Sequence, residues 1–146
     1  MRIYPPVYMV GGMAVMAALD HWAPLARLVP ATWIWIAAVP AAAGLGLAGW
    51  SALVFRRHRT TVHPFRRADA LVTSGPFAFS RNPIYLGMAL LLLGLALALG
   101  SITPFLVIPA FMAVINHRIV RDEERMLAET FGDEFSAYGA RVRRWL

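Results

Sequence analysis

Cysteine and lysine are both absent from this chain of 146 residues, so all 14 of its basic residues are arginines. Without cysteine, the chain has no disulfide bond, no thiolate metal site and no cysteine nucleophile. Without lysine, it has neither a Schiff-base lysine nor the lysine of a phosphate-binding P-loop. Reactions that depend on either side chain are therefore excluded.

Charge is also scarce, and most of it is positive. Only 15% of the residues are charged and 59% are hydrophobic, whereas a soluble domain averages about 25% charged residues. The 14 arginines outnumber 8 acidic residues, which gives a net charge of +6. In a chain this apolar, the excess indicates contact with anionic lipid headgroups rather than with nucleic acid. Membrane lipids are therefore expected partners, and nucleic acid is not.

The hydrophobic residues are gathered into blocks with very few charges. Residues 32–55 form a run of about 24 residues, which is enough to cross a bilayer core of ~30 Å. The uncharged run 84–115 would be ~48 Å long as one helix. A turn near Gly100 and Pro104 is therefore expected to divide it into two shorter spans.

These blocks predict an all-α integral membrane protein with about four transmembrane helices, in a single membrane domain over residues 1–146. The expected spans are approximately residues 5–19, 32–55, 84–99 and 102–115. The last two are short, which favours tilting or local thinning of the bilayer. The alanines before Asp20 leave a cleavable signal peptide as a minor alternative for the first block.

The arginines predict the orientation of the chain. Six lie in the loop 56–83 and six in the tail 116–146, whereas only Arg27 lies between the first two spans. Cytoplasmic segments carry an excess of basic residues, so both termini, the loop and the helical tail are expected in the cytoplasm. A short, lysine-free, arginine-rich chain is typical of a bacterium, so the expected location is the bacterial cytoplasmic membrane.

Two other patterns have ordinary structural explanations. Gly44, Gly46 and Gly49 spell G-x-G-x-x-G, but inside an apolar helix with no strand before it, so helix packing is expected instead of dinucleotide binding. Small residues four apart favour the same packing: Ala42 with Gly46, Gly44 with Ala48, and Gly94 with Ala98. The four histidines have no metal-ligand spacing, so no metal is expected.

The tail predicts two helices. The first ends near Gly132, and a second, amphipathic helix begins at Asp133, with apolar residues at helical spacing and arginines that suit a lipid surface. Those apolar residues are Phe135, Tyr138, Val142 and Trp145. The charged residues 118–125 can be nothing more than a solvated, salt-bridged face.

The segment before the third span combines a turn with a helix start. Asn82 is a suitable N-cap, and Pro83 is a suitable first helical residue. Capping does not explain why Arg81, several aromatic residues and Gly87 meet at the same membrane boundary.

Three segments of this half of the chain follow a common family pattern. They are Leu71-Val72-Thr73-Ser74-Gly75-Pro76-Phe77, then Arg81-Asn82-Pro83-x-Tyr85-x-Gly87, then Glu123-Glu124-x-x-Leu127 with Phe131-Gly132-x-x-Phe135-x-x-Tyr138. Over roughly residues 60–146 the chain resembles the isoprenylcysteine carboxyl methyltransferase family, which is related to the membrane phospholipid N-methyltransferases. It departs at Asn82, where the prenylcysteine enzymes have histidine; an amide hydrogen-bonds but carries no charge.

The resemblance implies methyl transfer from S-adenosylmethionine to an amphiphilic or lipid-like acceptor. The cofactor-binding residues that it implies are Ser74, Gly75, Pro76, Phe77, Asn82, Pro83, Tyr85, Glu123 and Glu124. The candidate catalytic residues are Arg81, Arg121 and Glu124, since a guanidinium can hold the carboxylate of the cofactor or of an acceptor. Methyl transfer from a sulfonium needs orientation rather than a protein nucleophile, which suits a chain without cysteine and lysine.

The acceptor stays open. The resemblance implies an activity like that of protein-S-isoprenylcysteine O-methyltransferase, with a phospholipid amine or a small thiol as alternative acceptors. A non-catalytic membrane scaffold is the alternative of another class. A transporter is disfavoured because residues 32–55 and 84–115 contain no charge.

Overall fold

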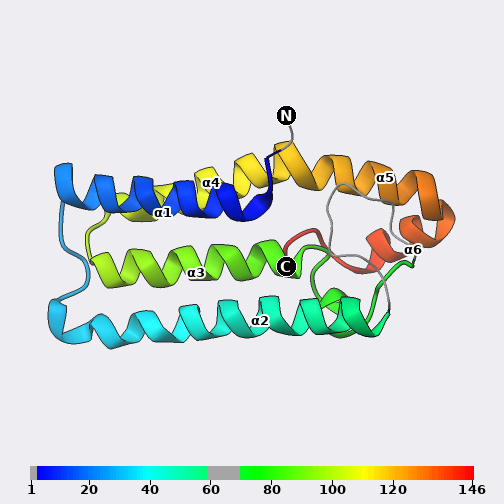
Figure 1. Ribbon diagram of the computed structural model, residues 1–146, viewed down its shortest axis with the longest axis horizontal. Coiled ribbons are helices and arrows are strands. Elements are labelled where there is room, and N and C mark those ends of the chain that lie inside the picture. The colour runs from blue at the N-terminus through cyan, green and yellow to red at the C-terminus, as the bar shows by residue number, and fades with distance from the viewer. Residues whose placement is uncertain (1–2, 59–69) are drawn as a thin grey trace.

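The chain folds into a bundle of long helices with smaller helices at one end (Figure 1). The computed structural model describes residues 3–58 and 70–146, and this part contains helices and no β-strand, which confirms the all-α class there. Three loop arginines that support the expected orientation, Arg59, Arg66 and Arg67, lie outside the described residues.

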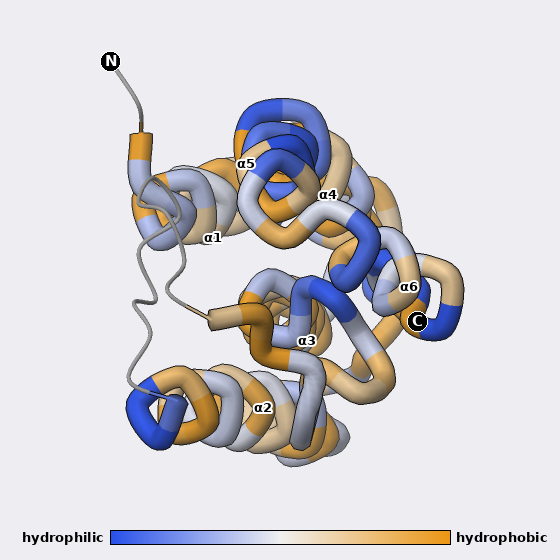
Figure 2. Tube along the Cα trace, turned by 90° about the vertical axis from the view of Figure 1, so that its right-hand side faces the viewer, coloured by the Kyte–Doolittle hydropathy of each residue, from blue (hydrophilic) through white to orange (hydrophobic). Residues whose placement is uncertain are grey.

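The described helices follow the expected blocks. The long elements are α1 (Pro5–Trp22), η1 (Ala31–Ala37) running into α2 (Ala38–Arg57), α3 (Pro83–Leu99), and η3 (Thr103–Leu106) running into α4 (Val107–Ile115). The smaller elements are η2 (Gly75–Ala78), the π-helical η4 (Asn116–Val120), α5 (Arg121–Phe131) and α6 (Asp133–Arg141). Helix α3 is central: it lies between α2 and the pair α1 and α4 in both views (Figures 1 and 2).

Within residues 3–58 and 70–146, two continuous helices are long and apolar enough to cross a membrane, judged by length and composition. They are Ala31–Arg57, with 27 residues, and Thr103–Phe131, with 29 residues. Helix α3 is apolar but has only 17 residues. At 1.5 Å per residue the 29-residue helix is ~43 Å long, which exceeds a ~30 Å bilayer core. Its charged last part, α5, therefore extends beyond the apolar layer.

The expected turn between the last two blocks is confirmed. Helix α3 ends at Leu99, and Gly100 follows in the left-handed conformation with φ of +83°. Its N–H donates to the carbonyl of Ala96, which closes the helix. The next helix then begins with Thr103 and Pro104.

Helices α2 and α3 pack closely because glycines face each other. A Cβ atom on Gly44 would lie 2.5 Å from the carbonyl oxygen of Gly87, and one on Gly94 would lie 3.0 Å from that of Ala37. The expected packing role of Gly44 and Gly94 is thus confirmed. It is wrong for Gly46, which is exposed and has open space where a Cβ would point.

The helix expected from Asp133 is present as α6, but it ends at Arg141, so the expectation is wrong for Val142 and Trp145, which follow it. Its apolar face is also buried against the protein. Phe135, Tyr138 and Val142 are buried together and pack against Leu71 and residues of α5. Trp145 packs instead on the main core, whose fully buried members include Leu92. The apolar face therefore covers the protein itself, because α6 folds back after Gly132, where φ is +50°.

Candidate functional site

Hydrophilic residues gather at the end of the bundle that Figure 2 faces, on α5 and at the C-terminal end of α2. Three parts of the chain meet here: the segment 74–85, helix α5 and the C-terminal residues after α6. Apolar contacts hold the segment that leads into α3.

Residues Ser74 to Phe77 are anchored to α2 and α6. Gly75 has φ of +61°, and a Cβ there would lie 3.1 Å from a methyl carbon of Val54. Phe77 is buried beside Val54, with its ring 4.8 Å from that of Phe55. The hydroxyl of Tyr138 donates to the carbonyl of Phe77 at 2.7 Å. The loop is thereby held rigidly beside the polar end of the bundle.

Asn82 occupies the expected N-cap position of α3, with Pro83 next as the first helical residue. Its side chain, however, makes no capping hydrogen bond, so the expectation is wrong for the side chain. The amide Nδ2 donates instead to the backbone carbonyl of Arg144 at 3.0 Å. Arg81 N–H also donates to the carbonyl of Arg143, at 3.0 Å. The C-terminal segment thus holds the Asn82 amide through its Nδ2 donor, and Oδ1, the atom that a cap would use, accepts from no N–H of α3.

Glu123 lies against the start of α3. The hydroxyl of Tyr85 donates to its Oε1 at 2.7 Å. The pKa of Glu123 is raised to about 7, mainly by burial and also by the charge of Glu124, while the hydrogen bond from Tyr85 acts in the opposite direction. A carboxyl with this pKa changes charge near neutral pH.

Glu124 faces two guanidinium groups. Arg81 Nη1 lies 3.2 Å from its Oε1, and Arg144 binds both oxygens, with Nε at 3.0 Å from Oε1 and Nη2 on Oε2. Arg144 also donates from Nη1 to Asn116 Oδ1 at 3.1 Å. The Arg81–Glu124–Arg144 triad therefore combines two positive charges with one negative charge.

Arg81 is the member of the triad with unused hydrogen-bonding capacity. Its side chain is only 18% exposed, and its Nε atom is buried with no hydrogen-bond partner among the described residues. Phe135 and Gly139 of α6 pack beside its guanidinium. A buried unpaired donor is costly, so a ligand atom that accepts from Arg81 would be stabilised.

Helix α5 is preceded by a π-helical turn. Residues Asn116–Val120 form this turn directly after α4. A π-turn accommodates an extra residue and changes which side chains face a neighbouring helix, and such turns are frequent at functional sites. It lies between Asn116 and the acidic pair, both of which join the polar network.

The structure brings together most of the residues that the sequence singled out. Arg81, Asn82 and Glu124 are joined through Arg144. Tyr85 bonds to Glu123, the sequence neighbour of Glu124. Arg121 does not join these contacts: this side chain is exposed and has no ion pair with either glutamate in the described part of the chain.

Sequence reasoning missed four participants, namely Ser80, Asn116, Tyr138 in its polar role, and Arg144. The arginines of residues 141–144 were interpreted as a lipid-binding group, and nothing in their spacing distinguishes Arg144 from its neighbours. Asn116 and Arg144 lie 28 residues apart in the sequence, so no local pattern joins them.

The residues present fit S-adenosylmethionine. Its carboxylate matches the excess positive charge and the unpartnered Nε of Arg81. Its hydroxyl and amino groups match Glu123, whose side chain bonds to a phenol and, among the described residues, to no cation. Within residues 3–58 and 70–146, no three histidine, aspartate or glutamate side chains are grouped to hold a metal ion.

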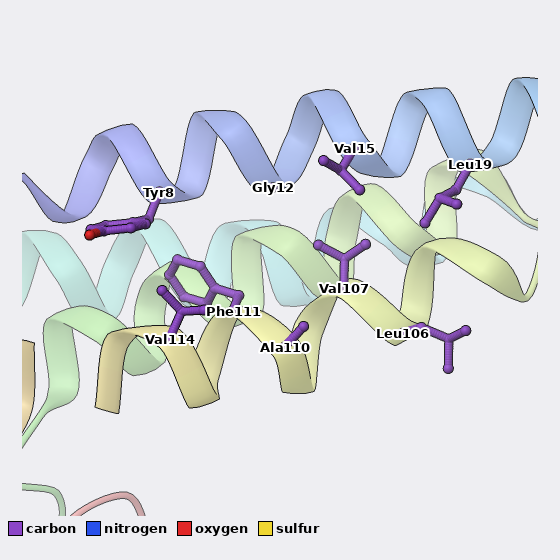
Figure 3. Close-up of a pocket in the computed structure, with 9 residues that line it drawn as sticks. All are labelled: Tyr8, Gly12, Val15, Leu19, Leu106, Val107, Ala110, Phe111 and Val114. Carbon is purple, nitrogen blue, oxygen red and sulfur yellow. The ribbon is translucent and has the colours of Figure 1, made fainter. Parts of the chain in front are cut away.

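An apolar groove of about 330 Å³ lies between α1 and α4 (Figure 3). Figure 3 shows Tyr8, Phe111 and Val114 at one end of the groove and Leu19 and Leu106 at the other. The remaining lining residues are Gly12, Val15, Val107 and Ala110. Val114 is two residues before Asn116, so this end of the groove lies where α4 meets η4, although residues two apart point to different sides of a helix.

Comparison with known proteins gives one family and several relatives. Residues 32–134 match the phospholipid methyltransferase family. This range contains the predicted site residues, but it ends before Arg144. No solved structure matches.

Two similar proteins have names that refer to metal resistance. A cobalt-zinc-cadmium resistance protein of Cupriavidus metallidurans is 35% identical over 77 residues, which are 53% of this chain and 35% of that protein. A nickel-cobalt-cadmium resistance protein of Alcaligenes xylosoxydans is 30% identical over 77 residues, 53% of this chain and 36% of that protein. The chain thus spans about a third of their length. An uncharacterised protein of Haemophilus influenzae is 41% identical over 63 residues, 43% of this chain and all of that protein.

Proposed function

Because this chain belongs to the phospholipid methyltransferase family, we propose that it is a membrane methyltransferase that uses S-adenosylmethionine and an amphiphilic acceptor. The observation that carries the proposal is the meeting of the Arg81–Tyr85 segment with Glu123 and Glu124 at the polar end of an apolar bundle. The family match supports methyl transfer, and the donor set of the site supports the cofactor.

Each residue of the site has a role in holding the cofactor. Glu123 accepts hydrogen bonds from its ribose hydroxyls or its amino group, with Tyr85 fixing the carboxylate. Arg81 holds its carboxylate, and Glu124 orients Arg81. The loop Ser74–Phe77 and the Asn82–Pro83 helix start form the adjoining wall. Arg121, exposed at the rim, remains a candidate for contact with the acceptor headgroup.

Methyl transfer from a sulfonium requires no covalent bond to the protein. Bound S-adenosylmethionine supplies an activated methyl group together with its own leaving group. The residues of the chain align the acceptor with that methyl group and exclude water, and such alignment lowers the barrier by up to ~7–11 kcal/mol in well-oriented systems. The rigid anchoring of the loop through Phe77 and Tyr138 supports this role.

The acceptor carries an apolar chain in this proposal. The groove between α1 and α4 has apolar walls and runs along α4 from Leu106 to Val114, near the junction with η4. An alkyl chain in the groove would direct its headgroup toward the polar end of the bundle. The headgroup is a prenylcysteine-like carboxylate or a phospholipid amine; a small thiol would not use the groove.

The proposal includes a multi-pass topology. The two candidate spans contain α2 and α4, and in this proposal α1 and α3 add two further crossings, which gives four crossings within one membrane domain. Both termini, the loop 56–83 and the tail 116–146 then face the cytoplasm of a bacterium. The cofactor enters from that side, and the acceptor enters sideways from the bilayer.

A transfer assay tests the function. The purified protein in nanodiscs is incubated with S-adenosylmethionine labelled at the methyl group and with a bacterial lipid extract. We expect label in the organic phase that depends on intact protein. Label only in water-soluble products would contradict an amphiphilic acceptor. No transfer together with no cofactor binding would reject the enzyme and favour a scaffold subunit.

A further inference from the structure

Arg144 lies at the centre of the polar network, although the match to the family ends before it. Its guanidinium binds Glu124 on α5 and Asn116 on η4. Its backbone carbonyl accepts from Asn82 Nδ2 at 3.0 Å and from Ser80 Oγ at 3.4 Å. One residue near the C-terminus thus joins both parts of the chain that form the candidate site.

The two arginines of the triad do not share Glu124 equally. Arg144 uses two nitrogens on the two carboxylate oxygens, the geometry in which arginine binds a carboxylate most strongly. Arg81 makes one contact, at 3.2 Å, and its Nε has no partner among the described residues. The other nearby acid, Glu123, is bonded to Tyr85. Arg144 therefore satisfies most of Glu124, and the charge of Arg81 stays largely uncompensated.

We propose that Arg144 is a positioning residue that binds Glu124 and so keeps Arg81 available for an anionic group of the ligand. This inference rests on the proposed function. The anionic group is a carboxylate or a phosphate, supplied either by the amino-acid part of the cofactor or by a lipid headgroup. Without Arg144, Glu124 pairs with Arg81 alone and neutralises it. The loss is therefore specific to ligands that carry the anion.

The experiment uses variants at two adjacent arginines of the full chain. Arg144→Ala removes the side-chain contacts and keeps the backbone carbonyl, and Arg144→Lys keeps a charge without the paired geometry. Arg143→Ala is the matched control, because the Arg143 side chain is exposed and only its carbonyl contacts the site. Thermal midpoints in detergent show that each variant is folded.

Binding is measured by calorimetry with paired probes that differ in the anion. S-adenosylhomocysteine has the carboxylate, and 5′-methylthioadenosine has the same nucleoside without it. We expect Arg144→Ala to weaken S-adenosylhomocysteine about 10- to 100-fold, the usual range for a charge-assisted contact, and methylthioadenosine much less. Arg144→Lys should recover part of the loss, and Arg143→Ala should bind like the wild type. Short-chain phosphatidic acid against the matching diacylglycerol tests the phosphate source in the same way.

The possible results distinguish a failure of the positioning role from a failure of the proposed function. If the wild-type chain binds none of the four probes, the proposed function and the inference both fail. If it binds them and Arg144→Ala binds them equally well, only the positioning role is wrong. A loss of the same size for the anionic and the uncharged member of each pair would indicate general loosening, and would also overturn the role.

Discussion

Glu123 and Glu124 are neighbours in the sequence, but they meet opposite environments. Glu124 is compensated by two guanidinium groups, whereas Glu123 receives a hydrogen bond from the phenol of Tyr85 and pairs with no cation in the part of the chain that the structure describes. The two glutamates, which the sequence predicts as a cofactor-binding pair, therefore have different roles. Glu124 organises the arginines, and Glu123 is left to bind a ligand.

The raised pKa of Glu123 predicts that the fold loses stability as pH rises. Its pKa is about 7 in the folded chain and 4.5 for an unperturbed glutamate, so the folded state holds the proton more tightly than the unfolded state. Stability should be greatest near or below pH 4.5 as far as this group is concerned, and should fall as pH rises through about 7. Glu123→Gln should remove this slope. Thermal midpoints measured between about pH 5 and pH 8 give the comparison.

Asp122→Asn is the control for that experiment, because Asp122 is exposed and its ion pair among the described residues is a 3.8 Å contact with Arg125. It should keep the slope of the wild type. A slope that persists unchanged in Glu123→Gln would show that other groups cause the pH dependence.

At the scale of single residues, the sequence predicts roles that depend on neighbouring residues, but it does not predict contacts between residues far apart in the chain. Pro83 is the first residue of α3, as expected from its position next to Asn82. The partner of the Asn82 side chain is the carbonyl of Arg144, 62 residues away. Capping rules consider only nearby backbone, so they cannot include a distant carbonyl that orients the amide through its Nδ2 donor.

At the scale of the elements, the α2–α3 contact determines where the loop enters the site. Gly44 and Gly87 let the two backbones approach closely enough that a Cβ would meet a carbonyl oxygen. Gly87 lies one turn after the start of α3, close to Tyr85, so this contact also fixes the position of the Tyr85–Glu123 pair.

Gly44→Ala should therefore destabilise the bundle, by about 1–3 kcal/mol as for other overpacked sites. Gly46→Ala is the matched control, because it adds the same methyl group where there is open space. It should be neutral or stabilising by up to ~1 kcal/mol, since alanine favours helix more than glycine does. Thermal unfolding in one detergent measures both. Equal midpoints would contradict the packing geometry.

The groove between α1 and α4 leads to a prediction about the acceptor. Each methylene buried in it should contribute up to ~0.8 kcal/mol until the groove is full. Ala110→Leu adds volume to its lining and should lower the apparent affinity for long-chain acceptors while the affinity for S-adenosylmethionine stays unchanged. An acceptor series of increasing chain length checks this. No dependence on length, with good turnover of a small hydrophilic acceptor, would reject the groove as the acceptor site.

The helices themselves were predictable because hydrophobic runs, glycines and prolines mark them locally. The break at Gly100 and the stop at Gly132 follow from the conformational freedom of glycine. The π-helical turn at Asn116–Val120 was not predictable, because no composition signal distinguishes it from ordinary helix. The burial of the apolar face of α6 against the protein also depends on tertiary packing, and an amphipathic pattern alone fits a lipid surface equally well.

At the scale of the whole molecule, polar and apolar regions separate along the bundle. The C-terminal end of α2, the loop before α3 and helices α5 and α6 share one end (Figures 1 and 2). The opposite end contains the turns between α1 and η1 and between α3 and η3, which pair through Arg27 and Ser101. This separation agrees with a site at one membrane surface.

Reporter fusions test that orientation. Fusions after Phe55 and at Leu146 should report the cytoplasm, and a fusion near Ala26 should report the other side, because basic residues concentrate in the loop 56–83 and the tail. A cytoplasmic signal near Ala26 would contradict the four-span arrangement.

The central claim is that S-adenosylmethionine binds beside Glu123, and calorimetric titration into the purified chain in detergent measures it directly. We expect saturable binding to the wild type and to the control Asp122→Asn. Glu123→Gln should bind more weakly by about 1.5–3 kcal/mol, the usual size for a charge-assisted hydrogen bond. No saturable binding to the wild type, or equal affinity in Glu123→Gln, would contradict the account.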